Sequence, residues 1–172
     1  HNNREMISPN VDKARIKDNI ELKRQSLADA YEEIFGDAVA EYNAKQRRSD
    51  RKISDYFEKM FGVRADTMRA DTVIKNDNKQ QSFYEYVVGV GTMHDTGYAS
   101  SPEAAKVAVE CLREYMAGFG ERNPQFHVFN AVIHQDEATP HLHYDMIPYA
   151  DGMKKGMTRQ QGINKALEQM GY

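Results

Sequence analysis

The sequence predicts an α+β domain built on an antiparallel sheet with flanking helices. Some segments place apolar side chains at the period of about 3.6 residues that marks an amphipathic helix, and others are rich in the aromatic and β-branched residues that favour strands. The last two strand-like segments, 126–134 and 141–149, are separated by only six residues, which is typical of a hairpin. Helices between strands, followed by a closing hairpin, indicate an antiparallel sheet covered by helices.

The first part of the chain is expected to be helical. Segment 26–46 repeats apolar residues at helical spacing, and segment 51–62 does the same before Gly62, which suits a helix C-terminus. The stretch KQRRSDRK at 45–52 carries a run of charges between them. Such a run more often marks a solvated helix face or turn than a DNA contact, and we interpret it as solvated.

The second part combines strands with one further long helix. Segment 82–93 is rich in aromatic and β-branched residues, and its glycines, Gly89 and Gly91, indicate a bulge or a close backbone approach. Segment 100–120 has serines at its start, a proline in its first turn and glycines at its end, which makes it the clearest helix of the sequence. The two hairpin strands follow, and the tail regains helical character from about Gln160.

Composition limits the number of domains and the compartment. With 172 residues, of which 40% are hydrophobic, the chain suffices for one domain, placed at 1–172. The single cysteine, Cys111, allows no internal disulfide, and neither a signal peptide nor an apolar run of about 18 residues is present. We therefore expect a cytoplasmic protein without membrane contact. The net charge of −3 neither supports nor excludes DNA binding, which depends on local basic patches.

The stretch HQDEATPHLH at 134–143 holds three of the six histidines. If the two hairpin strands pair around the loop QDEATP, His134 lies opposite His141, and the alternation of side chains along a strand puts His143 on the same face as His141. Cβ atoms of cross-strand neighbours are about 5 Å apart and diagonal ones about 7 Å, within reach of one shared ion. The pattern predicts a triangle of imidazoles with open coordination positions, as a catalytic metal site requires.

Two acidic residues lie in the loop between these histidines. Glu137 is expected to accept a hydrogen bond from a ligating imidazole, and Asp136 could do the same. Paired histidines on a strand can be ordinary surface residues, but a third histidine at the matching hairpin position favours a metal site. His94 is interpreted as a loop residue and His127 as a strand-edge residue, neither of them part of a site.

Motifs in three parts of the chain resemble those of the Mob/Pre plasmid mobilisation and recombination proteins, the MobV group of relaxases. The stretch 134–143 is similar to the family's metal motif HxDExTPHxH, and the family's motif HNxR matches the start of the chain at His1, Asn2 and Arg4. A further motif has a proline-asparagine pair, then an arginine and, four residues on, an asparagine. It is similar to segment 8–19, with Pro9, Asn10, Arg15 and Asn19.

The resemblance implies a histidine-hydrophobe-histidine endonuclease fold that acts on single-stranded or hairpin DNA at a plasmid transfer origin. A manganese or magnesium ion at His134, His141 and His143 would polarise the scissile phosphate, although three neutral imidazoles would bind zinc more tightly. The histidine of HNxR, His1, would attack the phosphorus and stay joined to the 5′-phosphate, whereas most related relaxases use a tyrosine.

Other site residues follow from the same resemblance. Arg4 would take part in catalysis with His1, and an arginine suits bidentate phosphate contacts. Glu137 is a further catalytic candidate, because the hairpin loop places it beside the histidines. The side chains implied to contact DNA are Asn2, Arg4, Arg15 and Asn19. The family also implies a short strand around NIEL at 19–22.

The ends of the chain and the type of activity leave alternatives open. The family has a strand ahead of HNxR and continues beyond its relaxase region, so we expect a fragment of a longer protein that can meet accessory mobilisation proteins. One alternative function is a metal-dependent phosphodiester hydrolase with Glu137 or Asp136 as general base. The other is a non-catalytic DNA-binding module in which the metal is structural.

Overall fold

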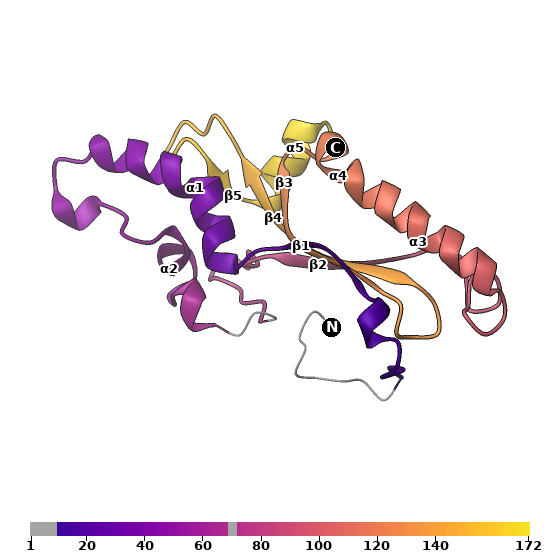
Figure 1. The fold of residues 1–172 in the computed structure, drawn as a ribbon. Helices are drawn as coiled ribbons and strands as arrows, with labels where there is room; N and C mark the ends of the chain where they lie inside the picture. Colours follow the sequence, from indigo (N-terminus) through magenta and orange to yellow (C-terminus); the bar gives the residue numbers. More distant parts are fainter. Residues whose placement is uncertain (1–9, 69–71) are drawn as a thin grey trace. The chain divides into compact units, whose positions relative to one another are not determined.

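The computed structural model describes residues 10–68 and 72–172, and it confirms the predicted fold class. An open antiparallel sheet of five strands is flanked by helices, with strand order β1-β3-β4-β2 and β5 paired to β4 (Figure 1). The strands are β1 (Ile20–Arg24), β2 (Tyr84–Gly89), β3 (Phe126–His134), β4 (His141–Ala150) and β5 (Gln160–Gln161). The helices are α1 (Leu27–Ala44), α2 (Tyr56–Phe61), α3 (Pro102–Ala117), α4 (Phe119–Arg122) and α5 (Ile163–Met170), and three short 3-10 turns are η1 (Ile16–Asp18), η2 (Ser49–Arg51) and η3 (Ala65–Thr67).

The chain divides into two compact units, each assembled from separate stretches of sequence. The first unit comprises the chain up to Arg24, Glu85–Arg122 and Val128–Asp145. The second unit comprises Gln25–Tyr84, Asn123–His127 and Met146–Tyr172.

In the first unit, one face of the sheet is covered and the other carries the histidines. The rings of Tyr115 on α3 and Phe119 on α4 lie 6.5 and 5.0 Å from the ring of Tyr144 on β4, so these helices pack on that face. Because successive strand residues point to opposite faces, His143 lies on the face opposite Tyr144. On β3, Ile133 is fully buried while its neighbour His134 is half-buried.

The edge strand β1 confirms the short strand expected near 19–22. It pairs antiparallel with β3, with Ile20 opposite Ile133 and Arg24 opposite Asn130. The register shifts between Glu21 and Lys23, which marks an irregularity in the ladder.

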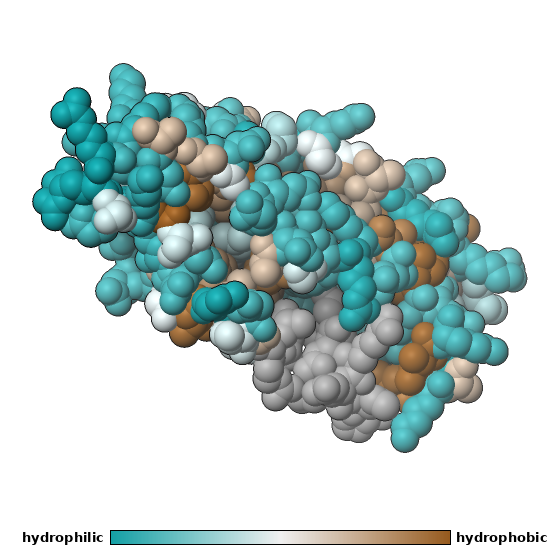
Figure 2. Space-filling model, turned by 60° about the vertical axis from the view of Figure 1, so that its left-hand side comes forward, coloured by the Kyte–Doolittle hydropathy of each residue, from teal (hydrophilic) through white to brown (hydrophobic). Residues whose placement is uncertain are grey.

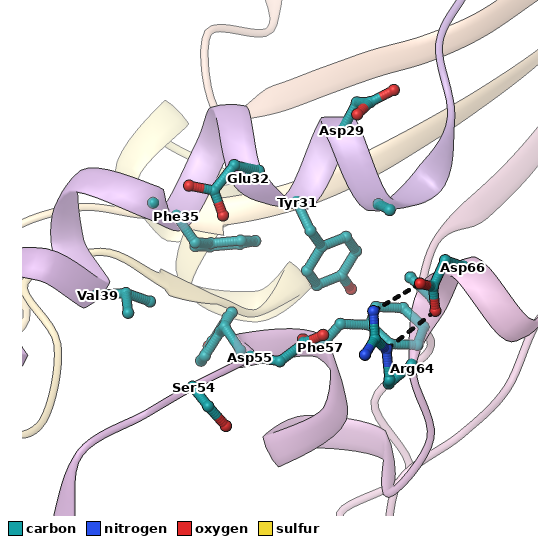
Figure 3. Close-up of a pocket in the computed structure, with 14 residues that line it drawn as sticks. Asp29, Tyr31, Glu32, Phe35, Val39, Ser54, Asp55, Phe57, Arg64 and Asp66 are labelled. Atoms are coloured by element: carbon teal, nitrogen blue, oxygen red, sulfur yellow. Dashed lines mark hydrogen bonds and ion pairs between the residues drawn. The ribbon is translucent and has the colours of Figure 1, made fainter.

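In the second unit, α1 and α2 bury an aromatic cluster. Tyr31 and Phe35 project from α1 toward α2 (Figure 3), where the ring of Phe57 lies 4.8 Å from that of Tyr31. Phe35 and Phe57 are 1% and 2% exposed. The helix α1 begins after Ser26, whose side chain accepts a hydrogen bond from the Asp29 N–H and so caps the helix.

Several elements are shorter than the sequence predicts. The helix expected at 51–62 begins only after Asp55, because the Asp55 side chain caps the Glu58 N–H. It ends at Gly62 as predicted, with φ +75°. The charge run 45–52 follows the end of α1 and includes the exposed 3-10 turn η2, consistent with a solvated segment.

The helix expected at 100–120 is interrupted at Gly118, which separates α3 from α4. The strand expected at 82–93 ends at Gly89, and the chain then turns at Gly91, whose φ is +72°. A Cβ at Gly91 would lie 2.9 Å from the Thr96 side chain, so here the prediction of a close approach is confirmed, while Gly89 has open space around it. At the tail, Gln160 lies in β5 rather than in a helix, and α5 starts three residues later.

The remaining sequence expectations can be placed briefly. His94 lies in a turn as predicted, and His127 lies near the start of β3, where its ring is 3.1 Å from the Gln25 side chain. Cys111 is exposed on α3. Across the described ranges, none of the helices combines the length and apolar character needed to cross a bilayer. The face seen in Figure 2 is mostly hydrophilic, with hydrophobic residues in several small groups.

Candidate metal centre and its supporting residues

The first unit brings the three histidines of the β3–β4 hairpin together. The ring centroids of His134 and His141 are 5.4 Å apart, those of His134 and His143 are 5.1 Å apart, and those of His141 and His143 are 5.2 Å apart. The sequence puts them there because His134 ends β3 and His141 begins β4, with only the loop 135–140 between. The imidazoles therefore form the nearly equilateral triangle that the hairpin spacing predicts.

Each of the three imidazoles directs its Nδ1 atom at an oxygen. His143 Nδ1 lies 2.9 Å from Glu85 Oε1, His141 Nδ1 lies 2.9 Å from the Thr139 carbonyl, and His134 Nδ1 lies 3.4 Å from Asp136 Oδ1. Carbonyl and carboxylate oxygens only accept hydrogen bonds, so Nδ1 is the protonated nitrogen in each ring. The Nε2 atoms then keep their lone pairs, which is the tautomer that a metal-ligating histidine needs.

The Nε2 atom of His134 is buried and has no hydrogen-bond partner among the described residues. Burial lowers the pKa of His134, the nearby His143 lowers it further, and Asp136 opposes both. The neutral form, which alone can donate a lone pair, is therefore favoured. A buried nitrogen without a partner is costly for the fold, and it requires a reason.

The three imidazole groups are suitable ligands for a divalent ion, although their side chains are not yet arranged around a common binding position. Within 10–68 and 72–172, no set of three or more histidine, cysteine, aspartate or glutamate side chains is arranged as a ready metal-binding group. The three imidazoles nevertheless supply the type of ligand that manganese, zinc and related ions accept, because each Nδ1 atom is already engaged by an oxygen and each Nε2 atom can face an ion. The observation that favours a metal ion here is that the buried Nε2 of His134 has no hydrogen-bond partner among the described residues.

The loop between the histidines is held in place by a segment far away in sequence. Asn19 accepts a hydrogen bond from the Gln135 N–H at 2.7 Å and donates one to Asp136 Oδ2 at 2.8 Å. The Asp12 N–H donates to the Asp136 carbonyl at 2.6 Å. Since the other carboxylate oxygen of Asp136 faces His134, Asn19 supports that imidazole through Asp136.

Arg15 and Tyr98 hold the same loop from two sides. The Arg15 guanidinium donates to the Gln135 carbonyl, and its carbon lies 3.5 Å from the centre of the Tyr98 ring. Tyr98 in turn donates its hydroxyl to Gln135 Oε1 at 2.9 Å and its backbone N–H to the Ala138 carbonyl at 3.1 Å. Figure 1 shows the segment before β1 beside the loop that joins β3 to β4.

Glu137 lies on a different side of the cluster from the one expected. Its Oε2 is 4.0 Å from His141 Nε2, the nitrogen that is available to an ion, rather than near a Nδ1 atom. The oxygens that accept from the imidazoles instead belong to Asp136, Thr139 and Glu85. The Glu137 side chain is 28% exposed.

Comparison with known proteins supplies the family. A family model described as plasmid recombination enzyme, Mob/Pre, matches residues 1–171. The chain belongs to this family. The resemblance of the three motifs to Mob/Pre proteins is thereby confirmed.

Curated Mob/Pre relatives include the plasmid recombination enzyme type 3 of Staphylococcus aureus and that of Mammaliicoccus lentus. Each is 27% identical to the chain over 136 residues. That stretch is 72% of this chain but 28% of each relative, so the chain spans much less than the length of the relatives. No solved structure matches the chain.

The Mob/Pre motif HNxR falls where the structure gives no placement. His1, Asn2 and Arg4 lie outside the described residues, and their expected roles stay predictions. The DNA contacts expected of Arg15 and Asn19 also stay predictions, although both side chains are engaged by the loop 135–140.

Two acidic residues on the histidine face of the sheet were not identified by the sequence analysis. Glu85 on β2 contacts His143, and Asp145 on β4 is 3% exposed and accepts a hydrogen bond from Asn130 at 3.2 Å. A signal exists for each. Asp145 continues the alternation of His141 and His143, and Glu85 is an acidic residue inside an otherwise aromatic and β-branched strand.

The second unit contains a pocket of a different kind (Figure 3). It lies between α1, α2 and η3, and its lining includes Tyr31, Phe35, Glu32 and the ion pair of Arg64 with Asp66. None of the site residues predicted from the sequence lines it. The candidate site is therefore the histidine cluster of the first unit.

Proposed function

We propose that this chain is the DNA-nicking and strand-transfer domain of a plasmid mobilisation relaxase. Its substrate would be single-stranded DNA beside a hairpin at a transfer origin, and its product a covalent adduct between His1 and the 5′-phosphate. The observation that supports the proposal best is the triangle of imidazoles with every Nδ1 engaged, found in a chain of the plasmid recombination enzyme family.

His134, His141 and His143 would hold one divalent ion, with manganese or magnesium expected and zinc the main competitor. The bound ion would neutralise charge on the scissile phosphate and make the phosphorus more electrophilic. Binding would be accompanied by side-chain rotation, because the present arrangement is not a ready metal-binding group. Asp136, Thr139 and Glu85 would keep the Nε2 atoms facing the ion.

The nitrogen of a neutral His1 imidazole would form a P–N bond while the bond from phosphorus to the 3′-oxygen breaks. The phosphorylated imidazole loses a proton and the departing 3′-oxygen gains one, so the step balances. Glu137 is the carboxylate beside the Nε2 side of the cluster and is proposed to carry this proton. Arg4 and Asn2 would form the remaining contacts with the phosphate.

One experiment separates this function from its alternatives. Single-stranded oligonucleotides with a candidate origin hairpin, labelled at the 3′ end, are incubated with the protein and Mn²⁺ and then denatured. A labelled protein band supports the strand transferase, because the enzyme keeps the 5′-phosphate of the labelled fragment. Free cleaved product indicates a hydrolase, and intact DNA that is bound but not cut indicates a DNA-binding module. Addition of EDTA tests the requirement for a metal.

The chemistry of the adduct identifies the nucleophile. A phosphoramidate at His1 is broken by mild acid, whereas a tyrosyl phosphodiester is not. We expect an acid-labile adduct that is lost in His1→Ala. An adduct that survives acid, or that forms normally in His1→Ala, would show that a tyrosine carries the reaction.

A further inference from the structure

Of the carboxylate–histidine contacts among residues 10–68 and 72–172, the one that Glu85 makes with His143 is the shortest. Its Oε1 lies 2.9 Å from His143 Nδ1, compared with 3.4 Å between Asp136 and His134. The His143 side chain is 5% exposed and that of Glu85 is 39% exposed. The hydrogen bond therefore joins a buried ring to a carboxylate that reaches it from the neighbouring strand.

The strand β2 fixes Glu85 in this place. β2 lies next to β4 in the sheet, and the following residue, Tyr86, stacks on Tyr144 with ring centroids 5.6 Å apart. Because Tyr86 and Glu85 point to opposite faces, the Tyr86–Tyr144 stack on one face holds Glu85 against His143 on the other. The position of Glu85 is thus set by the sheet and not by a flexible loop.

We infer that Glu85 is a positioning residue of the histidine site, acting on the bound ion through His143. The inference rests on the metal site proposed above and adds a residue to it. The carboxylate holds the His143 proton on Nδ1, directs Nε2 toward the centre of the triangle and increases the basicity of that nitrogen. Removal of such an outer partner of a ligating histidine typically lowers metal affinity by about 10–100-fold.

The test measures Mn²⁺ binding to the metal-free protein by calorimetry, without DNA. Glu85→Ala removes the acceptor, and Glu85→Gln keeps an oxygen that can accept the hydrogen bond but lacks the charge. Glu110→Ala is the matched control, since Glu110 is in the same unit, 71% exposed at its side chain and paired only loosely with Arg113 at 3.5 Å. If Glu85→Ala does not fold, Glu85→Leu replaces it, because leucine fills a similar volume.

We expect the affinity for Mn²⁺ to fall about 10–100-fold in Glu85→Ala, less in Glu85→Gln and not in Glu110→Ala. In a His143→Ala background, Glu85→Ala should have no further effect on affinity, because its target is gone. A residue that only stabilised the fold would lower the melting temperature and leave the affinity unchanged.

Unchanged affinity in Glu85→Ala or Glu85→Leu, or an equal further loss in the His143→Ala background, would overturn the inference. If the unsubstituted protein binds no Mn²⁺, the proposed metal site fails and this inference fails with it. If the protein binds Mn²⁺ but forms no DNA adduct, the strand-transfer proposal fails while the role of Glu85 can still be supported by the affinities.

Discussion

The two units each bury a cluster of rings, and the clusters have opposite physical character. In the first unit, three imidazoles lie 5.1 to 5.4 Å apart and are held by hydrogen bonds to oxygens. In the second, Tyr31, Phe35 and Phe57 are packed by apolar contact, with the rings of Tyr31 and Phe57 4.8 Å apart. Similar spacing therefore serves stability in one place and is proposed to serve ion binding in the other.

The difference lies in what each ring does with its surroundings. A buried phenylalanine stabilises the fold through the area that it removes from water. A buried imidazole must find partners for two nitrogens, and the Nε2 of His134 has none among the described residues. We therefore expect substitutions in the histidine cluster to affect binding and catalysis, and substitutions in the aromatic cluster to affect stability.

The largest effect is expected for His141→Ala. Loss of one of three imidazole ligands should abolish Mn²⁺-dependent DNA cleavage and weaken Mn²⁺ binding more than the loss of any outer contact, while the melting temperature of the metal-free protein changes little. Cleavage assays and calorimetry check this, with His94→Ala, a turn residue in the same unit, as the control. Normal metal-dependent cleavage by His141→Ala would exclude His141 as a ligand.

In the aromatic cluster, Phe35→Ala should lower the free energy of unfolding by about 3–5 kcal/mol, because it leaves a cavity in a site that is 1% exposed. Urea denaturation measures the loss. Val63→Ala, 42% exposed in the same unit, should change stability very little. The contrast between the units would be broken if Phe35→Ala reduced Mn²⁺ affinity as strongly as it reduced stability.

Asn19→Ala tests whether a residue expected to contact DNA supports the metal site instead. Without the 2.8 Å hydrogen bond from Asn19, Asp136 is less well held against His134. The affinity for Mn²⁺ should therefore fall about tenfold, the lower end of the range of about 10–100-fold that is typical when a partner of a ligating histidine is removed. Calorimetry without DNA measures this, with Asn164→Ala, exposed on α5, as the control. A loss of DNA affinity with unchanged Mn²⁺ affinity would assign Asn19 to DNA contact alone.

The smallest effect concerns the two serine caps. Ser26→Ala should lower the free energy of unfolding by about 1 kcal/mol, because Ser26 caps the Asp29 N–H at the start of α1. Ser101 occupies the same position before α3, but its side chain makes no capping hydrogen bond with the described residues. Ser101→Ala should therefore cost less in the same urea titration, and an equal loss in both variants would contradict this reading of the caps.

The sequence predicted the parts of the fold that depend on local patterns. The hairpin of β3 and β4 was predicted almost to the residue, because both strands are rich in aromatic and aliphatic residues and a short loop connects them. Where local patterns competed, the prediction failed: Asp55 caps α2 and shortens it, and Gly118 divides the helix expected at 100–120. A two-residue strand such as β5 depends on its pairing with β4 and leaves no periodicity of its own.

The site could be predicted only as far as its residues are close in sequence. His134, His141 and His143 lie within ten positions, so strand alternation was enough to bring them together. Glu85 lies 58 positions before His143 and reaches it through the strand order β4-β2, which no local pattern specifies. For the same reason the contacts of Asn19 with the loop 135–140 appeared only in the folded chain.

The restraint of the loop 135–140 by Asp12, Arg15, Asn19 and Tyr98 has a kinetic and entropic consequence. Ordering six free residues would cost about 6–12 kcal/mol of backbone entropy at 1–2 kcal/mol each, and binding a ligand to a loose loop would have to supply it. Here that ordering is completed during folding, so the loop is preorganised even though the imidazole side chains would rotate when the ion binds. The Gln135 amide, whose N–H donates to Asn19, should then exchange with deuterium at nearly the same slow rate before and after Mn²⁺ is added.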